Sequence, residues 1–173
     1  AGGVDGRVAD QPKAHMIPRV LEPEVMDTAE EAADYDAMDH SSVNRLFVDD
    51  LLSAMPDVAK CVQVLDVGTG TAQIPIELAS RDFRGHITGV DLAEEMLSVG
   101  RRNVERTGIS CIDLERVDAK RLPHDDAAFD VVMSNSIVHH IPEPTGTLSE
   151  MRRVLRPGGL LFVRDLLRPK TAD

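Results

Sequence analysis

The sequence predicts an α/β protein in which helices cover both faces of a parallel β-sheet. From Cys61 onward, short apolar runs alternate with amphipathic segments of helical length. These apolar runs are continuous, as expected of strands that are buried on both faces. Because crossovers between parallel strands are right-handed, the alternation favours a doubly wound, Rossmann-like sheet. The chain of 173 residues has the length of one such domain.

Helices are expected before the sheet. Residues 1–18 are small, polar and interrupted by glycine and proline, and we expect them to be disordered. Residues 19–58 are expected to be helical, with one helix over Pro23–Met38 and a second that follows Ser41 as its N-cap. The remaining residues, 59–173, form the sheet domain.

Five strands are predicted, one at each apolar run. They cover residues 62–67, 86–90, 113–117, 129–134 and 160–163. The helices between them are predicted over residues 72–80 and 93–107, as a short turn at 136–140, and over a last helix ended by Arg156-Pro157-Gly158-Gly159. A doubly wound sheet of this kind has the spatial strand order 3-2-1-4-5.

A glycine-rich turn joins the first strand to the helix that follows it. Gly68 and Gly70 lack a Cβ atom, so the backbone can turn tightly there and approach a ligand. Thr71 is expected to cap the helix. Gln73 stands where a dinucleotide-binding turn carries glycine or alanine, which argues against a nicotinamide dinucleotide.

Acidic and polar residues follow the strands, at the edge where open α/β sheets bind ligands. Asp66 near the end of the first strand either caps loop amides or faces a cationic ligand group such as an ammonium. Asp91 lies about 20 residues beyond the turn, where a carboxylate accepts hydrogen bonds from two ribose hydroxyls. Asp118 follows the third strand, in a place to bind an adenine amino group. Asn135 and Ser136 follow the fourth.

Together these motifs resemble the class I S-adenosylmethionine-dependent methyltransferases of the ubiquinone/menaquinone-biosynthesis type. The resemblance covers about residues 60–165. The matching segments are Asp66–Ala72, Val90–Leu97, Val117–Ala119, Leu122-Pro123, Phe129–Ser136 and Glu150–Leu160. Ala72 departs from the family, which has a third glycine there, and we expect the extra methyl group to be tolerated.

The resemblance implies methyl transfer from S-adenosylmethionine to a small-molecule acceptor. In this family, residues at the positions of Gly68 and Gly70 border the methionine part of the cofactor. The residue at the position of Asp91 holds the ribose, and those at Asp118 and Ala119 border the adenine. The cofactor-binding residues predicted here are Asp66, Val67, Gly68, Thr69, Gly70, Asp91, Leu92, Met96, Asp118, Ala119, Asn135 and Ser136.

The resemblance also concerns the two ends of the chain. The N-terminal helices of such proteins often form a lid, and Tyr35 is either its cofactor-facing residue or a packing aromatic. The family has seven strands, so the last two strands are expected to be missing and the domain to be C-terminally truncated. The fifth strand then lies at the sheet edge, where an unpaired apolar strand favours pairing with a second copy of the chain.

Methyl transfer from a sulfonium requires of the protein mainly alignment and a dry site. A base is needed only when the acceptor is a hydroxyl or a protonated amine. His139 and His140 follow the fourth strand and are the candidate catalytic residues, the alternative being a structural role. Two other functions stay open: a non-catalytic or truncated S-adenosylmethionine-binding domain and, less favoured because of Gln73 and Asp66, an NAD-dependent dehydrogenase.

Composition limits the partners of the chain. Its net charge of −11 disfavours nucleic acid and membrane surfaces. Cys61 and Cys111 have neither CxxC spacing nor nearby histidines, so neither a disulfide nor a metal site is predicted. Since no apolar run has the length of a membrane span or the character of a signal peptide, a cytoplasmic location is expected.

Overall fold

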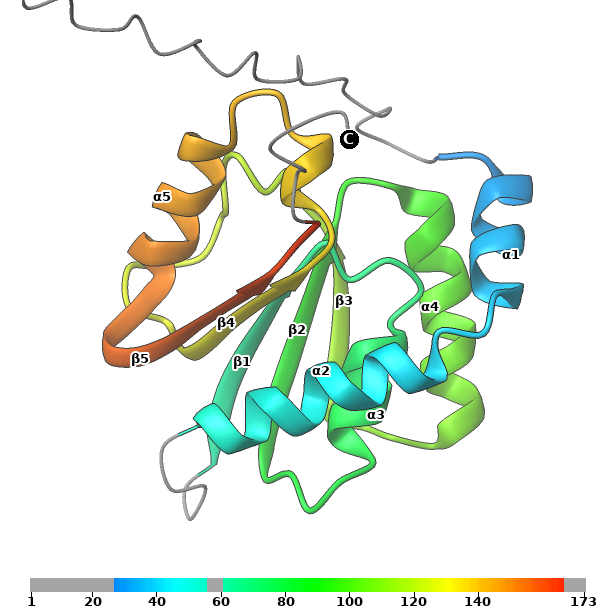
Figure 1. Cartoon of the computed structure of the whole chain (residues 1–173), viewed down its shortest axis with the longest axis horizontal. Coiled ribbons are helices and arrows are strands. Elements are labelled where there is room, and N and C mark those ends of the chain that lie inside the picture. Colours follow the sequence, from blue (N-terminus) through cyan, green and yellow to red (C-terminus); the bar gives the residue numbers. More distant parts are fainter. Residues whose placement is uncertain (1–26, 56–60, 167–173) are drawn as a thin grey trace, which may run out of the picture.

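The computed structural model describes residues 27–55 and 61–166. Two helices precede a domain in which strands and helices alternate (Figure 1). The helices are α1 (Ala29–Ala37), α2 (Ser41–Ala54), α3 (Gln73–Ala79), α4 (Glu94–Thr107), the 3-10 turn η1 (Val138–His140) and α5 (Pro144–Val154). The strands are β1 (Val62–Val67), β2 (Gly85–Asp91), β3 (Ile112–Arg116), β4 (Phe129–Asn135) and β5 (Leu155–Arg164).

The strands form one parallel sheet in the order β3-β2-β1-β4-β5. The predicted fold class is therefore confirmed, together with its strand order. Val64 of β1 lies opposite Ile87 of β2 on one side and Val131 of β4 on the other. The chain thus reverses its winding direction between β1 and β4, which opens a crevice at the carboxyl ends of these strands.

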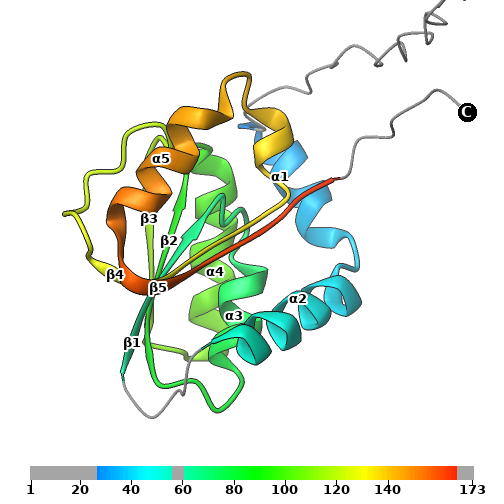
Figure 2. The same ribbon diagram turned by 60° about the vertical axis from the view of Figure 1, so that its left-hand side comes forward.

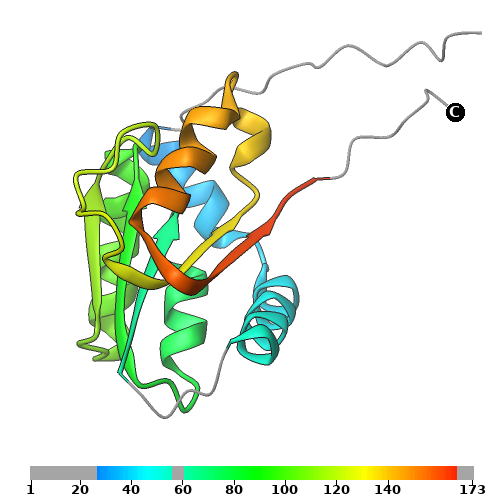
Figure 3. The same ribbon diagram turned by 90° about the vertical axis from the view of Figure 1, so that its left-hand side faces the viewer.

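Helices bury both faces of the sheet. On one face, Val64 and Met133 belong to an apolar cluster that includes Phe47 of α2 and Leu78 of α3. On the other face, the neighbouring residues Leu65 and Val132 pack in a second cluster with side chains of α5. Figure 3 shows α5 and α2 on opposite sides of β5. Because successive residues of a strand point to opposite faces, burial on both sides explains the continuous apolar runs of the sequence.

The helix starts differ from expectation at two positions. Ser41 is the first residue of α2 rather than its N-cap, which is His40. The backbone N–H of Ser41 donates instead to Asp39 Oδ1 at 3.0 Å. Thr71 does not cap α3, because Ala72 occupies the N-cap position. Both capping predictions were wrong.

The first helix has a start that the sequence analysis did not identify. Thr28 and Glu31 form a capping box, in which each side chain accepts a hydrogen bond from the backbone N–H of the other residue. The predicted start at Pro23 lies outside the described residues.

The fifth strand begins earlier than predicted. Leu155 pairs with Phe129 directly after α5, and the next regular pair joins Leu160 to Val131. The residues between, 156–159, form an irregularity within β5 rather than a simple helix end. The predicted strand start at Leu160 was therefore wrong, although regular pairing resumes there.

One face of β5 packs against α2. The Phe47 and Phe162 rings meet edge to face at 5.1 Å, and the guanidinium of Arg164 lies over both rings. In the described part of the sheet, β5 has β4 as its one strand neighbour. Leu161 and Val163 are each 38% exposed. Figure 2 shows β5 as the outermost strand, between α5 and α2.

Candidate functional site

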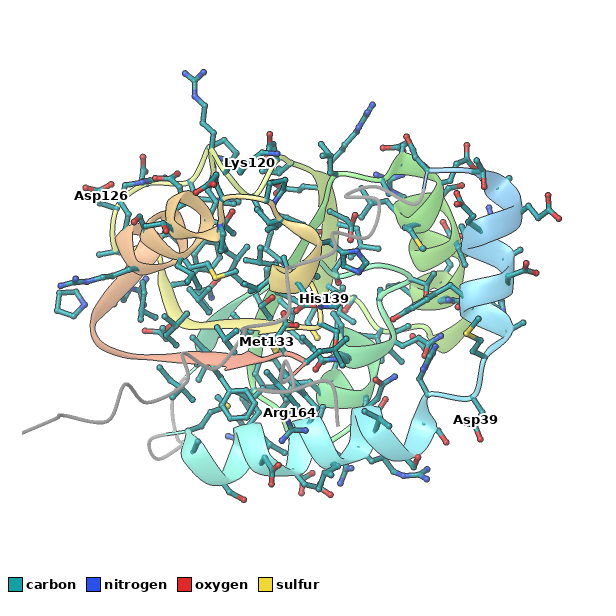
Figure 4. All side chains as sticks on the ribbon, turned by 45° about the horizontal axis from the view of Figure 1, so that its top comes forward. Asp39, Lys120, Asp126, Met133, His139 and Arg164 are labelled. Atoms are coloured by element: carbon teal, nitrogen blue, oxygen red, sulfur yellow. The ribbon has the colours of Figure 1, made fainter. Side chains whose placement is uncertain are left out.

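A cavity of about 400 Å³ lies at the carboxyl ends of the strands. Its volume is within the range of small-molecule sites. Most of the predicted site residues line it, namely Gly68, Gly70, Asp91, Leu92, Met96, Asp118, Ala119, Asn135, Ser136, His139 and His140, together with Tyr35. In Figure 4, His139 lies near the middle of the molecule, whereas Asp39 and Asp126 lie near its outer edges.

The glycine turn is held against β2 by its backbone. The N–H groups of Gly68 and Thr69 both donate to the Val90 carbonyl, at 2.8 and 3.0 Å. Gly68 has a positive φ of 79°, and a Cβ atom there would lie 2.1 Å from Ile137 Cγ2. Glycine is therefore required at this position by both conformation and space.

Ala72 adopts the left-handed conformation that glycine would adopt more easily. Its φ is 64°, and its side chain is fully buried. Gly100 of α4 packs close to this turn, because a Cβ atom on Gly100 would lie 3.2 Å from the Thr71 carbonyl carbon and 3.4 Å from the Ala72 Cβ. The extra methyl group is accommodated at the cost of a strained φ, on the order of 1–2 kcal/mol.

Asp91 is fixed by backbone donors of two loops. Its Oδ2 accepts the N–H of Gly70 at 2.8 Å, and its Oδ1 accepts the N–H of Ala93 at 3.0 Å. Burial raises the pKa of Asp91, and these backbone hydrogen bonds oppose that rise. The carboxylate is thus held in one orientation at the cavity wall.

Asp66 lies behind the cavity wall and is only 2% exposed. Burial raises the pKa of its carboxyl group to about 7, with a smaller contribution from the nearby Asp91 carboxylate. Burial, together with the charges of Asp66 and Asp91, also raises the pKa of Tyr35. The Tyr35 hydroxyl therefore stays protonated at neutral pH and is available as a hydrogen-bond donor.

A network of polar side chains fixes the N-terminal helices to the sheet domain. Asp36 Oδ1 accepts hydrogen bonds from Asn103 Nδ2 at 2.7 Å and Gln73 Nε2 at 3.2 Å. Gln73 Oε1 in turn accepts from Asn44 Nδ2 at 3.1 Å. Gln73 thus joins α1 and α2 to α3, which explains a long amide side chain where dinucleotide-binding turns have a small residue. The network also places Tyr35 at the cavity.

Arg153 of α5 clamps the loop between β3 and β4. Its guanidinium donates to the carbonyls of Leu122 and His124 and to the carboxylates of Glu150 and Asp126, at 2.8 to 2.9 Å. The five donors of a guanidinium suit such a role. Fixing this loop supports Asp118 and Ala119, which lie at its start and line the cavity.

The histidine wall of the cavity contains an acid that the sequence analysis missed. His139 Nδ1 lies 2.6 Å from Asp165 Oδ1, and the rings of His139 and His140 are 4.0 Å apart. Asp165 directly follows β5. The rule that identified Asp91 and Asp118, an acid after a strand, also applies to Asp165 and would have found it.

Three predicted cofactor residues do not line the cavity. Asp66 and Val67 are buried at the end of β1, and Thr69 packs over Gly89, where a Cβ atom would lie 2.6 Å from the Thr69 hydroxyl oxygen. Their assignments stay predictions, as do those of the lining residues. Further lining residues that the sequence analysis did not single out include Lys120, Ile137, Ile141 and Leu166.

Comparison with known proteins identifies the family of this fold and site. A family model described as "Methyltransferase domain" matches residues 65–163. The chain belongs to this methyltransferase family. The predicted resemblance to class I S-adenosylmethionine-dependent methyltransferases is thereby confirmed.

The relatives of this methyltransferase domain agree with the assignment. Demethylmenaquinone methyltransferase of Listeria welshimeri is 39% identical over 113 residues, 65% of this chain and 48% of that protein. The Bacillus subtilis enzyme of the same name is 38% identical over 115 residues, 66% of this chain and 49% of its own length. The methyltransferase chain thus spans about half the length of these curated relatives.

Solved structures extend the comparison to the fold. A SAM-dependent methyltransferase from Aquifex aeolicus has a TM-score of 0.69 at 22% identity, covering 84% of this chain and 77% of that one. The [4+2]-cyclase SpnF has a TM-score of 0.64 at 33% identity, covering 70% of this chain and 44% of that one. Because a cyclase shares the fold, the activity of this methyltransferase-family chain must be argued from its site.

Two general properties of the described residues bear on the site. None of the helices in 27–55 and 61–166 has the length and apolar character of a membrane-crossing segment. Within the same residues, no three His, Cys, Asp or Glu side chains gather closely enough to hold a metal ion.

Proposed function

We propose that the chain binds S-adenosylmethionine in the cavity and transfers its methyl group to a small-molecule acceptor. The observation that carries this proposal is the position of Asp91 between the glycine turn and the start of α4, at the cavity wall. Family membership supports the methyl transfer. The acceptor is proposed only as a class.

The geometry of Asp91 suits a ribose. A carboxylate has about four lone-pair sites, and the backbone N–H groups of Gly70 and Ala93 use one on each oxygen. The backbone N–H of Leu92 also acts on this carboxylate, and the lone-pair sites that remain are proposed to accept ribose hydroxyls. Because the backbone already fixes the carboxylate, this binding costs little side-chain entropy.

The rest of the cofactor site follows from the family correspondence. Gly68 and Gly70 are proposed to border the methionine part, and Asp118 and Ala119 the adenine. Asp66 is proposed to act from behind the wall as a negative charge for the cofactor ammonium. S-adenosylmethionine supplies an activated methyl group on a sulfonium, so the chain itself has to orient the reactants and exclude water.

The N-terminal segment is proposed to act as a lid of the sheet domain. Of the predicted lid, 19–58, the structure describes residues 27–55, and the predicted disordered segment, 1–18, lies outside the described residues. Tyr35 lines the cavity, and its ring lies 3.8 Å from the place of a Cβ atom on Gly70. This position supports the cofactor-facing role rather than packing alone.

Partners and location complete the proposal. The acidic net charge supports a small-molecule acceptor over nucleic acid or a membrane surface. The exposed edge of β5, with Leu161 and Val163, supports association with a second copy of the chain. Cys61 and Cys111 are free thiols, which supports a cytoplasmic location.

Calorimetric titration tests the cofactor. S-adenosylmethionine and its demethylated product should both bind, whereas NAD should not, because Gln73 takes the place of the small residue that a dinucleotide turn requires. Binding of NAD alone would favour the dehydrogenase, and binding of neither would refute the proposed site.

Methyl transfer needs a separate assay. The curated relatives are named for demethylmenaquinone, which makes its reduced, hydroquinone form the first acceptor to test. Cofactor binding combined with no methyl transfer to any acceptor would favour a non-catalytic binding domain or an activity of another class, such as that of the related cyclase.

A further inference from the structure

A pair of side chains at the cavity has no part in the proposed cofactor site. His139 lies on η1, and its Nδ1 is 2.6 Å from Oδ1 of Asp165, which follows β5. The two side chains are 22% and 18% exposed, so water screens the contact only in part. The backbone N–H of Ser136 donates to the Arg164 carbonyl at 2.9 Å and holds the two segments together.

Asp165 is itself fixed by the backbone. Its Oδ2 accepts the N–H of Val138 at 2.7 Å, and its Oδ1 also accepts the N–H of Leu166 at 2.6 Å. Both backbone partners are donors, and both oxygens of the Asp165 side chain act as acceptors. The orientation of the carboxylate toward His139 is therefore set before any ligand binds.

This contact determines which nitrogen of His139 carries the proton. A carboxylate oxygen accepts, so Nδ1 must donate, and in the neutral ring Nε2 is then the basic nitrogen. His139 lines the cavity, whereas Asp165 is not among its lining residues. Asp165 can therefore influence a molecule in the cavity only through its effect on His139.

We infer that Asp165 is a positioning residue, which holds His139 in the Nδ1–H form so that its Nε2 takes the proton of a hydroxyl acceptor. The inference rests on the proposed methyl transfer. A hydroxyl is the acceptor that most needs such a base, because a neutral amine already has a lone pair and a thiol ionises more readily.

The proposed step is balanced in atoms and charge. The O–H bond of the acceptor breaks, and its proton joins His139 Nε2. In a hydroquinone, the electron pair left on the oxygen is shared with the neighbouring ring carbon, and this carbon forms the bond to the methyl group. The carbon–sulfur pair stays on the sulfur as a neutral thioether. The ring carbon then loses its own proton, and the oxygen regains one from solvent. The imidazolium that forms is stabilised by the Asp165 carboxylate and then releases its proton to solvent.

The tautomer of His139 tests the inference without cofactor or acceptor. The full chain, labelled with 15N-histidine, is examined by long-range 1H–15N NMR at about pH 8, where a free histidine is neutral. His139→Gln identifies the signals. We expect the proton on Nδ1 in the wild type and a shift toward the Nε2–H form in Asp165→Asn, because an amide can also donate to the ring.

A second histidine–acid pair provides the matched control. His86 Nε2 lies 3.0 Å from Asp113 Oδ2 outside the cavity, and the Asp113 side chain is 70% exposed. Asp113→Asn should leave the His139 signals unchanged. A proton on Nε2 of His139 in the wild type, or an unchanged His139 spectrum in Asp165→Asn, would overturn the inference.

Turnover tests the role as a base. With reduced demethylmenaquinone as the probe, Asp165→Asn should lower kcat by roughly tenfold to a hundredfold, within the usual contribution of a general base. The KM of the probe and the affinity for S-adenosylmethionine should stay within about twofold, since Asp165 touches neither. An unchanged kcat, or no methylation of this hydroxyl probe by the wild type, would contradict the inference, whereas failure of the proposed function appears separately as absent cofactor binding.

Discussion

The two halves of the cavity hold their polar groups by different means. Around β1 and β2, the backbone does so, because each oxygen of Asp91 accepts a backbone N–H and the glycine turn is bonded to the Val90 carbonyl. Around β4 and β5, His139 is held by another side chain, Asp165. The positions of the polar groups around β1 and β2 thus depend on the backbone conformation. The position of His139, by contrast, can be altered by substituting the Asp165 side chain.

The half around β1 and β2 is also more deeply buried than the half around β4 and β5. Asp66 and its strand neighbours at the centre of the sheet are almost inaccessible to water, whereas Leu161 and Val163 of β5 are each 38% exposed. Substitutions should therefore affect stability strongly in the first half and weakly in the second. The three predictions that follow test this difference.

The largest expected effect is on the pH dependence of stability at Asp66. Its folded-state pKa of about 7 lies above the ordinary value of 3.8. The contribution of Asp66 to stability should therefore be fully present below about pH 4 and be lost as pH rises to about 7, by on the order of 4 kcal/mol. Asp66→Asn, which does not ionise, should be free of this loss.

Urea unfolding gives the free energy of unfolding of Asp66→Asn and of the wild type at about pH 4 and at about pH 8. The effect is the change, between the two pH values, in the difference between variant and wild type. The exposed Asp113→Asn serves as control, with an expected change within about 0.5 kcal/mol. A difference between Asp66→Asn and wild type that is the same at both pH values would show that folding does not raise the pKa of Asp66.

The next effect is expected at Gly68. Alanine there would bring its Cβ to 2.1 Å from Ile137 Cγ2 at a positive φ, and should destabilise the fold by about 3 kcal/mol. Gly108→Ala measures the cost of conformation alone, because its φ is also positive at 70° and nothing lies within 4 Å. That variant should lose only about 1 kcal/mol.

Combining Gly68→Ala with Ile137→Ala should remove the steric part of the effect. The double variant should then be destabilised by less than the sum of its two single variants in denaturant unfolding. Equal losses in Gly68→Ala and Gly108→Ala would contradict the close approach of the two loops.

The smallest effect on stability is expected at the edge of β5. Leu161→Lys and Val163→Lys should each change the free energy of unfolding by about 0.5 kcal/mol or less, because these positions are partly exposed. The same changes should abolish the proposed pairing of two chains, since charged edge residues oppose strand addition.

Light scattering compares the oligomeric state of the wild type and the lysine variants. The net charge of −11 acts over only about 8–10 Å in physiological salt and should not prevent pairing. A wild-type chain that stays monomeric, with β5 fully protected from hydrogen exchange, would refute association through this edge.

The contrast between the halves also explains what the sequence could predict. Asp66, Gly68 and Gly70 lie within one strand–turn–helix segment, which is a local pattern. Asp91 was predicted because it ends the next strand, about 20 residues beyond the turn, where such folds carry an acid. The parallel sheet followed from apolar runs that are buried on both faces. Local pattern was sufficient for these features.

Other features depended on contacts between distant residues. Asp165 meets His139 across 26 positions, and Gln73 meets Asp36 across 37, so neither contact has a local signal. Thr71 had a capping side chain, yet the left-handed Ala72 displaced the cap by one residue. The irregular start of β5 arises from its pairing with β4. The secondary-structure propensities of single residues do not predict such pairing.

The affinity of Asp91→Asn for S-adenosylmethionine tests the central claim most directly. The amide retains one acceptor oxygen, so at least one charge-assisted hydrogen bond to the ribose is lost, worth on the order of 1.5–3 kcal/mol. Calorimetry should therefore show binding weakened by roughly tenfold or more, with Asp113→Asn equal to the wild type. If Asp91→Asn binds S-adenosylmethionine as tightly as the wild type, Asp91 does not hold the ribose and the proposed cofactor site is wrong.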